Sequence, residues 1–341
     1  MSSAISSSSS GRVTVISVSI AIRDSVTLPA EQDEKRTRAK TIIHKCFTEK
    51  EVAHSNFSCN HFSLKPHLDI FITMYRAIFT DIDGTLFRQD LTIGERTKKA
   101  IRKAYESGVS IVLTSGRYIT GMERAQEQLD VPVIYAAING ALIKSGNTYL
   151  REKRIEKDAY IMAAEHLRGK VSSLIAFCET KFAIDSDDGW YDLQTRICGD
   201  EGIRMDISDP DQVLRKTGEA PYKILVKDND RKKIERLMEE LNAILGKRAK
   251  VISSSYNNFE ILPWGIDKED AVGIVSEHLG IKTDETIAFG DWDNDAGMIR
   301  KAGLGVAMAN GSENAKAAAG FITLSNDEDG IAYALEKFSV I

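Results

Sequence analysis

The stretch MYRAIFTDIDGTLF, residues 74–87, begins as a short apolar run and ends in two aspartates, Asp81 and Asp83, followed at once by Gly84 and Thr85. A short apolar run bounded by a turn signal is typical of a buried strand, whereas aspartate side chains are seldom buried without partners. Gly84 allows a tight turn directly behind the strand. The stretch therefore predicts a core strand that ends in a pair of carboxylates.

Strand and helix patterns alternate on both sides of a long central segment. After the first strand, residues 94–108 place apolar side chains at helical spacing before a stop at Gly108. The further expected elements are helices at 119–129, 267–279 and 294–302 and strands at 109–114, 131–137, 286–291, 304–310 and 321–324. This order implies right-handed crossovers, so the expected fold class is α/β, a parallel sheet with helices on both faces.

The central segment, residues 151–255, has helices and strands of its own. Helical patterns cover residues 157–169 and 230–245, and strand patterns cover residues 221–227 and 249–255. A block of mixed elements set inside a parallel-sheet domain is typical of an inserted domain. We therefore expect a core formed by residues 74–150 and 256–341, with residues 151–255 as an inserted α+β domain over the edge of the sheet.

Residues 1–73 differ in composition from the rest of the chain and open with the serine-rich MSSAISSSSSGR. The absence of acidic residues before Asp24 is compatible with an organelle-targeting segment, but the acidic cluster at residues 31–34 weakens that interpretation. We expect instead a disordered extension, or the product of an upstream start codon with Met74 as the true first residue.

The bulk composition is that of an ordinary soluble globular protein. The chain has 341 residues, 43% hydrophobic and 28% charged, with a net charge of −5. This charge offers no basic field, so we expect no nucleic-acid partner. No run approaches the roughly 20 apolar residues that cross a bilayer, so we expect no membrane partner. The four cysteines form no CxxC pair, which favours a cytosol-like, reducing compartment.

Four polar stretches are expected at one edge of the predicted sheet, because ligand sites in open parallel sheets lie at the carboxyl ends of the strands. They are DIDGT (81–85), TSGR (114–117), GIDKED (265–270) and GDWDND (290–295). If the sheet is as predicted, these stretches bring together Asp81, Asp83, Ser115, Gly116, Lys268, Asp291, Asn294 and Asp295.

A divalent cation is nearly required at such a cluster. Two like charges 4 Å apart in a protein-like medium repel by about 4 kcal/mol, so several ionised aspartates cannot share one site alone. Oxygen ligands without histidine or cysteine favour Mg²⁺ over zinc. Lys268, Ser115 and the backbone amides of Gly116 and Ile82 are the donors that a phosphoryl group needs. Together these groups describe a phosphoryl pocket.

The positions of the first two aspartates suggest their roles. Asp81, the last strand residue, can direct its carboxylate at phosphorus and form an aspartyl-phosphate that water then splits. Asp83, two residues further on, points in the same direction and can act as general acid in the first step and general base in the second.

These motifs resemble those of the haloacid dehalogenase superfamily. The stretches DIDGTL, TSGR, the lysine of GIDKED, and GDWDND resemble its four motifs, and their order with the long insert resembles its Cof-type branch. The segments INGALI, YKILVK, SSSYNNFEILPWGIDK, LGVAMAN and SNDEDGIA also match that branch, so the resemblance spans nearly all of residues 74–341 and none of residues 1–73.

The resemblance implies a Rossmann-like core, an inserted α/β cap of type IIB, and a Mg²⁺-dependent hydrolase of phosphoric monoesters that acts on a small phosphorylated metabolite such as a sugar phosphate. Separately, we expect a cytoplasmic protein that is a monomer or homodimer. It also implies roles for individual residues. Asp81 would be nucleophile and metal ligand, Asp83 acid/base and ligand through its backbone carbonyl, and Asp291 the third protein ligand; Ser115, Gly116, Lys268 and Asn294 would hold phosphate, with Asp295 supporting the metal site from behind.

The sequence departs from the family pattern beside two of these motifs. Asp267 and Glu269 flank Lys268, where the family usually has a small residue and a glycine, and Trp292 stands where glycine is common. The pocket's local shape and substrate preference therefore stay open. Two alternatives to hydrolysis also remain: a phosphotransferase or phosphomutase that uses the same intermediate, and a non-enzymatic receiver that accepts phosphate on a strand-end aspartate. The inserted domain and Asp83 argue against the receiver.

Overall fold

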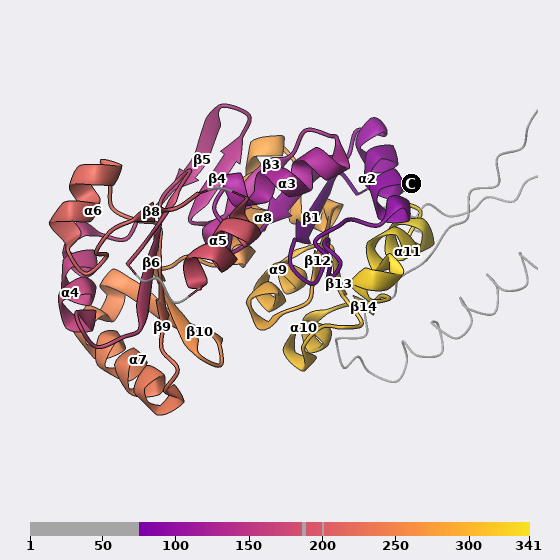
Figure 1. Ribbon diagram of the computed structural model, residues 1–341. Coiled ribbons are helices and arrows are strands. Elements are labelled where there is room, and N and C mark those ends of the chain that lie inside the picture. The colour runs from indigo at the N-terminus through magenta and orange to yellow at the C-terminus, as the bar shows by residue number, and fades with distance from the viewer. Residues whose placement is uncertain (1–74, 186–188, 200) are drawn as a thin grey trace, which may run out of the picture. The chain divides into compact units, whose positions relative to one another are not determined.

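The computed structural model describes residues 75–185, 189–199 and 201–341 (Figure 1). The expectation of a disordered or non-native extension at residues 1–73 concerns residues outside this described part. No helix in the described part is long and apolar enough to cross a membrane.

The first sheet of the described chain has eight strands in the order β14-β13-β12-β1-β2-β3-β4-β5. Its strands are β1 (Ala77–Asp81), β2 (Ser110–Thr114), β3 (Ile134–Ala137), β4 (Leu142–Ser145), β5 (Thr148–Glu152), β12 (Thr286–Gly290), β13 (Leu304–Ala307) and β14 (Phe321–Ile322). The pairs from β14 through β3 are all parallel, which confirms the predicted parallel core. The β4–β5 hairpin adds two antiparallel strands at one edge.

Helices cover both faces of this sheet. Neighbouring residues of β1 point to opposite faces, so each packs against a different set of helices. Ile78 packs in a cluster with residues of α2 (Glu95–Glu106), α3 (Thr120–Leu129) and α11 (Gly330–Lys337). Phe79 packs in another with residues of α8 (Lys268–Leu279) and α9 (Ala296–Lys301). The remaining helix of this part, α10 (Glu313–Ala318), contacts β13 and α9.

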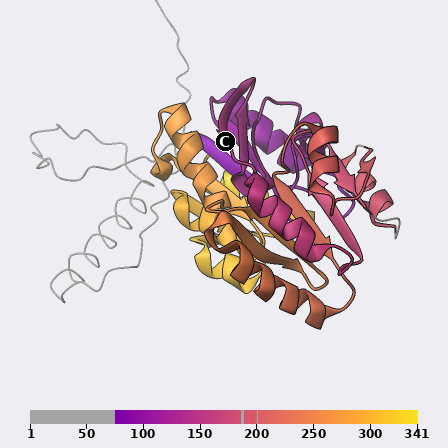
Figure 2. The ribbon, with the colours of Figure 1, turned by 90° about the vertical axis from the view of Figure 1, so that its left-hand side faces the viewer.

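The second sheet has six strands in the order β10-β11-β9-β6-β7-β8. They are β6 (Ser173–Phe177), β7 (Phe182–Ile184), β8 (Ile203–Arg204), β9 (Lys223–Lys227), β10 (Ala249–Ser255) and β11 (Asn258–Pro263). Residues of α4 (Lys157–Leu167), α6 (Pro210–Thr217) and α7 (Arg231–Leu245) form an apolar cluster with one face of this sheet. Figures 1 and 2 show α4 and α7 lying along it.

One element lies on the other side of the expected domain division. Residues 258–263 were expected in the core part, but as β11 they pair antiparallel with β9 and β10 of the second sheet. The reason is that Tyr256 and Asn257 form a tight turn between β10 and β11, so the two strands make a hairpin. The chain leaves the second sheet only after Pro263.

Parallel pairing brings the carboxyl ends of β1, β2 and β12 to the same edge of the first sheet. Asp81 is level with Thr114 of β2, and Thr80 is level with Phe289 of β12. The loops that follow these strands therefore start side by side.

The two parts also contact one another through helices: α5 (Trp190–Cys198), in the part with the second sheet, packs against α3 of the first part.

Candidate active site

Three aspartates meet at this edge of the first sheet. Asp81 ends β1, Asp291 directly follows β12, and Asp295 closes the short 3₁₀ helix η4 (Asp293–Asp295). Each offers a carboxylate oxygen, and these oxygens all lie within 4.8 Å of one another. All three side chains are buried, with Asp295 fully inaccessible. The sequence prediction that the first and last motifs converge is thus met by the geometry.

The positive charge of Lys268 offsets the repulsion between the carboxylates of this cluster. It is the first residue of α8, and its Nζ donates to Asp81 Oδ1 at 2.6 Å and to Asp295 Oδ1 at 2.7 Å. Burial alone would lower the pKa of Lys268, but the two carboxylates outweigh it, so its pKa lies above the ordinary lysine value. Asp267, beside it, is the N-cap of α8, since its side chain accepts a hydrogen bond from the Glu269 amide.

Burial also has the largest effect on the pKa values of Asp81 and Asp291, the two aspartates at the open side of the cluster. It raises the pKa of Asp81 well above the usual carboxyl value despite the opposing charge of Lys268. It raises the pKa of Asp291 to about 6, although a hydrogen bond from Thr85 Oγ1 to Asp291 Oδ1 at 2.7 Å acts in the opposite direction. These carboxyls therefore hold their negative charge at a free-energy cost that a cation would relieve.

The donor set fits a hard divalent cation. Asp295 is fully engaged, because its Oδ1 accepts from Lys268 and its Oδ2 from the amides of Asp291 and Trp292. Within the described part of the chain, Oδ2 of Asp81 and Oδ2 of Asp291 accept no hydrogen bond, so each can ligate a metal. Oxygen ligands at a buried, acidic site are those that Mg²⁺ prefers. Asp295 also offers a carboxylate oxygen to this group, although both of its oxygens already accept hydrogen bonds.

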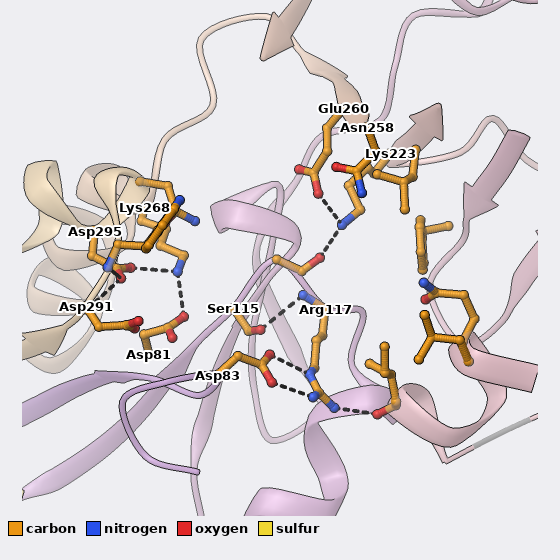
Figure 3. A pocket seen from close by; sticks show the side chains of 18 of the residues that line it. Asp81, Asp83, Ser115, Arg117, Lys223, Asn258, Glu260, Lys268, Asp291 and Asp295 are labelled. Carbon is orange, nitrogen blue, oxygen red and sulfur yellow. Dashed lines mark hydrogen bonds and ion pairs between the residues drawn. The ribbon is translucent and has the colours of Figure 1, made fainter. Parts of the chain in front are cut away.

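Asp83 lies away from the three clustered aspartates and contacts Arg117 instead (Figure 3). The guanidinium of Arg117 donates from Nε to Asp83 Oδ2 at 2.8 Å and from Nη2 to Asp83 Oδ1 at 2.6 Å. Its Nη1 donates to the carbonyl oxygens of Gly121 in α3 and Ile197 in α5. Arg117 therefore joins the loop that carries Asp83 to the last turn of α5.

The residues expected to hold phosphate lie around the same opening. Ser115 and Gly116 follow β2, and the Ser115 hydroxyl accepts a hydrogen bond from the Arg117 amide at 3.1 Å. Ile82, between the two aspartates of the first motif, is fully buried. Asn294 is in η4, and its Nδ2 donates to Asn139 Oδ1 at 3.3 Å.

A cavity of about 630 Å³ opens over these groups and is lined by both sheets. The first sheet and its loops contribute the aspartates, Lys268, Ser115, Gly116, Arg117, Trp292 and Asn294. The part with the second sheet contributes Phe177, Trp190, Leu193, Gln194, Ile197, Lys223, Leu225, Asn258 and Glu260. Trp292, which stands where glycine is common in the family pattern, is 57% exposed at this opening.

Sequence reasoning missed six polar residues of the cavity and its rim: Arg117, Asn139, Gln194, Lys223, Asn258 and Glu260. Arg117 could have been predicted, since it is the last residue of the TSGR motif. Alternation along residues 223–227 and 258–261 could have indicated that Lys223 and Glu260 point away from the helices of their sheet. Nothing local in the sequence indicated which surface they would face.

Comparison with known proteins agrees with this geometry. The family model described as haloacid dehalogenase-like hydrolase matches residues 78–335. The phosphatase YcsE of Bacillus subtilis, named for 5-amino-6-(5-phospho-D-ribitylamino)uracil, is 30% identical over 263 residues, covering 77% of this chain and 95% of that protein. The chloroplastic endoribonuclease YBEY of Arabidopsis thaliana is 28% identical over 287 residues, covering 80% of this chain; the match spans only 48% of that longer relative, about half its length.

Solved structures show the same architecture. A haloacid dehalogenase-like hydrolase from Bacteroides thetaiotaomicron is 28% identical with a TM-score of 0.70, covering 77% of this chain and 99% of that chain. A sugar phosphatase of subclass IIB is 23% identical with a TM-score of 0.66, covering 78% and 100%, which supports the fold alone, a parallel-sheet core with a type IIB cap. Both the predicted resemblance and the predicted fold class are confirmed, and the chain belongs to the haloacid dehalogenase-like hydrolases.

Proposed function

We propose that this enzyme is a Mg²⁺-dependent phosphatase that hydrolyses a small phosphorylated metabolite through an aspartyl-phosphate on Asp81, with the part built on the second sheet acting as a substrate-binding cap. The observation that carries the proposal is the buried cluster of Asp81, Asp291 and Asp295 around Lys268 at the inner end of a cavity. The phosphatase names of relatives support the reaction class. The four scattered cysteines, with no CxxC pair, favour a cytosol-like compartment, which is the location we propose.

Asp81 is the nucleophile in the first step. One of its carboxylate oxygens attacks phosphorus, and the bond from phosphorus to the leaving oxygen breaks. Asp83 gives its proton to that leaving oxygen, so the product leaves as a neutral alcohol. This role requires Asp83 to turn from Arg117 toward the cavity, a rotation that its half-exposed side chain permits.

Water completes the cycle in the second step. Asp83, now ionised, takes a proton from water, the resulting hydroxide attacks phosphorus, and the bond between phosphorus and Asp81 breaks to release inorganic phosphate. Lys268, Ser115, Asn294 and the amides of Gly116 and Ile82 hold the phosphoryl oxygens. Mg²⁺, held by Asp81, Asp291 and the Asp83 carbonyl, would offset the charge on those oxygens.

Phosphate release from an aryl phosphate tests this proposal. We expect turnover by the purified full chain with MgCl₂, loss of turnover in EDTA, and loss in Asp81→Asn. The matched control is Asp293→Asn, which makes the same change in η4, beside Asp291, at a side chain that accepts a hydrogen bond from Ser312 and does not line the cavity; we expect it to retain activity. Turnover that persists without a divalent metal, or in Asp81→Asn, contradicts the mechanism.

A further inference from the structure

Every cation that lines the cavity, among the described residues, already has a carboxylate partner. Lys268 contacts Asp81 and Asp295, Arg117 contacts Asp83, and Lys223 contacts Glu260. The pairs of Lys268 and Arg117 include the residues that carry the reaction under the proposed function. The remaining pair, Lys223 with Glu260, has no part in that chemistry.

The Lys223–Glu260 pair belongs to the cap side of the cavity. Lys223 begins β9 and Glu260 is in β11, and their Nζ and Oε1 atoms are 3.1 Å apart. Ile224 and Phe259, next to them in sequence, pack in the apolar cluster with the cap helices, so alternation turns Lys223 and Glu260 to the other face. Figure 3 shows both side chains directed toward the loop that carries Ser115.

This pair is rigidly held and well desolvated. Lys223 is 5% exposed, and its Nζ also donates to the Gly116 carbonyl at 2.6 Å. Glu260 Oε2 accepts from Asn139 Nδ2 at 3.3 Å, and Asn139 in turn contacts Asn294. Removing one partner would leave the other as a buried charge without a counter-ion, facing the cavity.

Among the residues that the structure describes, the rest of the cap lining is uncharged. Its side chains are Phe177, Trp190, Leu193, Gln194, Ile197, Leu225 and Asn258. The part of a substrate beyond the phosphoryl group would therefore enter a region whose two charges cancel. A carboxylate or second phosphate there would be desolvated beside Glu260 without a cation to receive it, and an ammonium would meet Lys223.

We propose that this site selects phosphomonoesters whose leaving group carries no charge, and that the Lys223–Glu260 ion pair enforces the selection. The inference rests on the proposed phosphatase function and adds the class of its substrate. It predicts that breaking the pair on one side creates a preference for leaving groups of the charge that has been removed.

Three aryl phosphates of nearly equal size test the selection. They carry at the para position a carbamoyl group (neutral), a carboxylate (anionic) or an aminomethyl group (cationic). With the full chain and MgCl₂, we expect kcat/KM to be highest for the carbamoyl compound by about tenfold or more, since a buried charge without a partner strongly disfavours binding.

Isosteric variants then test the cause. In Glu260→Gln the ratio of kcat/KM for the carboxylate over the carbamoyl compound should rise about tenfold, because Lys223 becomes an available cation. In Lys223→Met the corresponding ratio for the aminomethyl compound should rise. Glu219→Gln is the matched control, since Glu219 pairs with Arg154 in the cap and does not line the cavity; its ratios should stay at the wild-type values. Ratios compare substrates on one folded protein, so a general loss of activity does not mimic the effect.

The outcomes separate this inference from the proposed function. No phosphate release from any of the three compounds, with metal present, overturns the phosphatase proposal. Release that is as fast from the charged compounds as from the neutral one overturns the selection while the phosphatase proposal stands. Wild-type discrimination that is unchanged in Glu260→Gln and Lys223→Met overturns the role of the pair. If Glu260→Gln does not fold, the Lys223→Met ratio decides.

Discussion

Replacing Lys268 by methionine should destabilise the metal-free protein strongly and make its stability depend on Mg²⁺. Methionine keeps most of the side-chain volume of lysine but removes the charge that contacts Asp81 at 2.6 Å and Asp295 at 2.7 Å. All three side chains are at most 8% exposed, so water cannot take over the role of the ammonium group. The two carboxylates then remain buried without their counter-ion.

Removing one partner of a buried ion pair costs about 3–5 kcal/mol. For a folded unit of this size, that corresponds to a fall in Tm of roughly 6–20 °C. If Mg²⁺ binds the folded state as proposed, it should stabilise that state by about 2.7 kcal/mol at one hundred times its Kd. Because the variant site carries one positive charge fewer, it should bind Mg²⁺ more tightly, so the increase in Tm on adding MgCl₂ should exceed that of the wild type.

Thermal unfolding followed by circular dichroism, in EDTA and in saturating MgCl₂, measures both effects. The control is Lys301→Met, which breaks a pair with Glu269 at 3.9 Å whose side chains are about half exposed; it should cost less than about 1 kcal/mol. A Lys268→Met protein that melts with the wild type in EDTA would refute the view that Lys268 compensates the buried carboxylates. An equal or smaller Mg²⁺ shift in the variant would refute the charge argument for the metal site.

Three further changes test separate features. Gly84→Ala should lower kcat at least tenfold, since φ is +81° and the new Cβ would lie 2.4 Å from Asp291 Oδ2. The control is Gly108→Ala, where φ is +92° and the new Cβ would have no atom within 4 Å. This control carries the same backbone strain and should leave kcat unchanged. Arg117→Met should lower kcat about tenfold without changing inhibition by inorganic phosphate, because it removes the contacts with the Gly121 and Ile197 carbonyls that join α3 to α5 and so leaves the cap less well positioned over the core. Weaker phosphate inhibition would contradict this. Burial raises the pKa of the Cys178 thiol to about 11. The rate of its alkylation by iodoacetamide, followed by mass spectrometry, should therefore be slow in the folded protein at neutral pH, rise with pH, and become fast on unfolding. Equal alkylation rates in the folded and unfolded protein would contradict this expectation.

Much of the core and of its site could be predicted from the sequence, because the information is local. Apolar runs separated by helical patterns specify parallel strands, and parallel strands bring their carboxyl ends to one edge. The positions of Asp81, Lys268, Asp291 and Asp295 follow from this rule together with the motifs that contain them. The need for a cation follows from charge repulsion alone. The roles assigned to these residues remain predictions until the experiments above are made.

Other features depended on contacts between distant parts of the chain. The hairpin that places β11 in the second sheet arises from strand pairing, and the boundary expected near residue 255 did not anticipate it. The contacts of Arg117 with Ile197, and of Lys223 with Gly116, join residues 80 and 107 positions apart. Alternation can tell which face of a strand a side chain occupies, but only the packing of the two sheets against a shared cavity decides what that face meets. For that reason the sequence by itself determined which residues form the acidic cluster at the edge of the first sheet. The tertiary structure decided which residues of the second sheet face that cluster across the cavity.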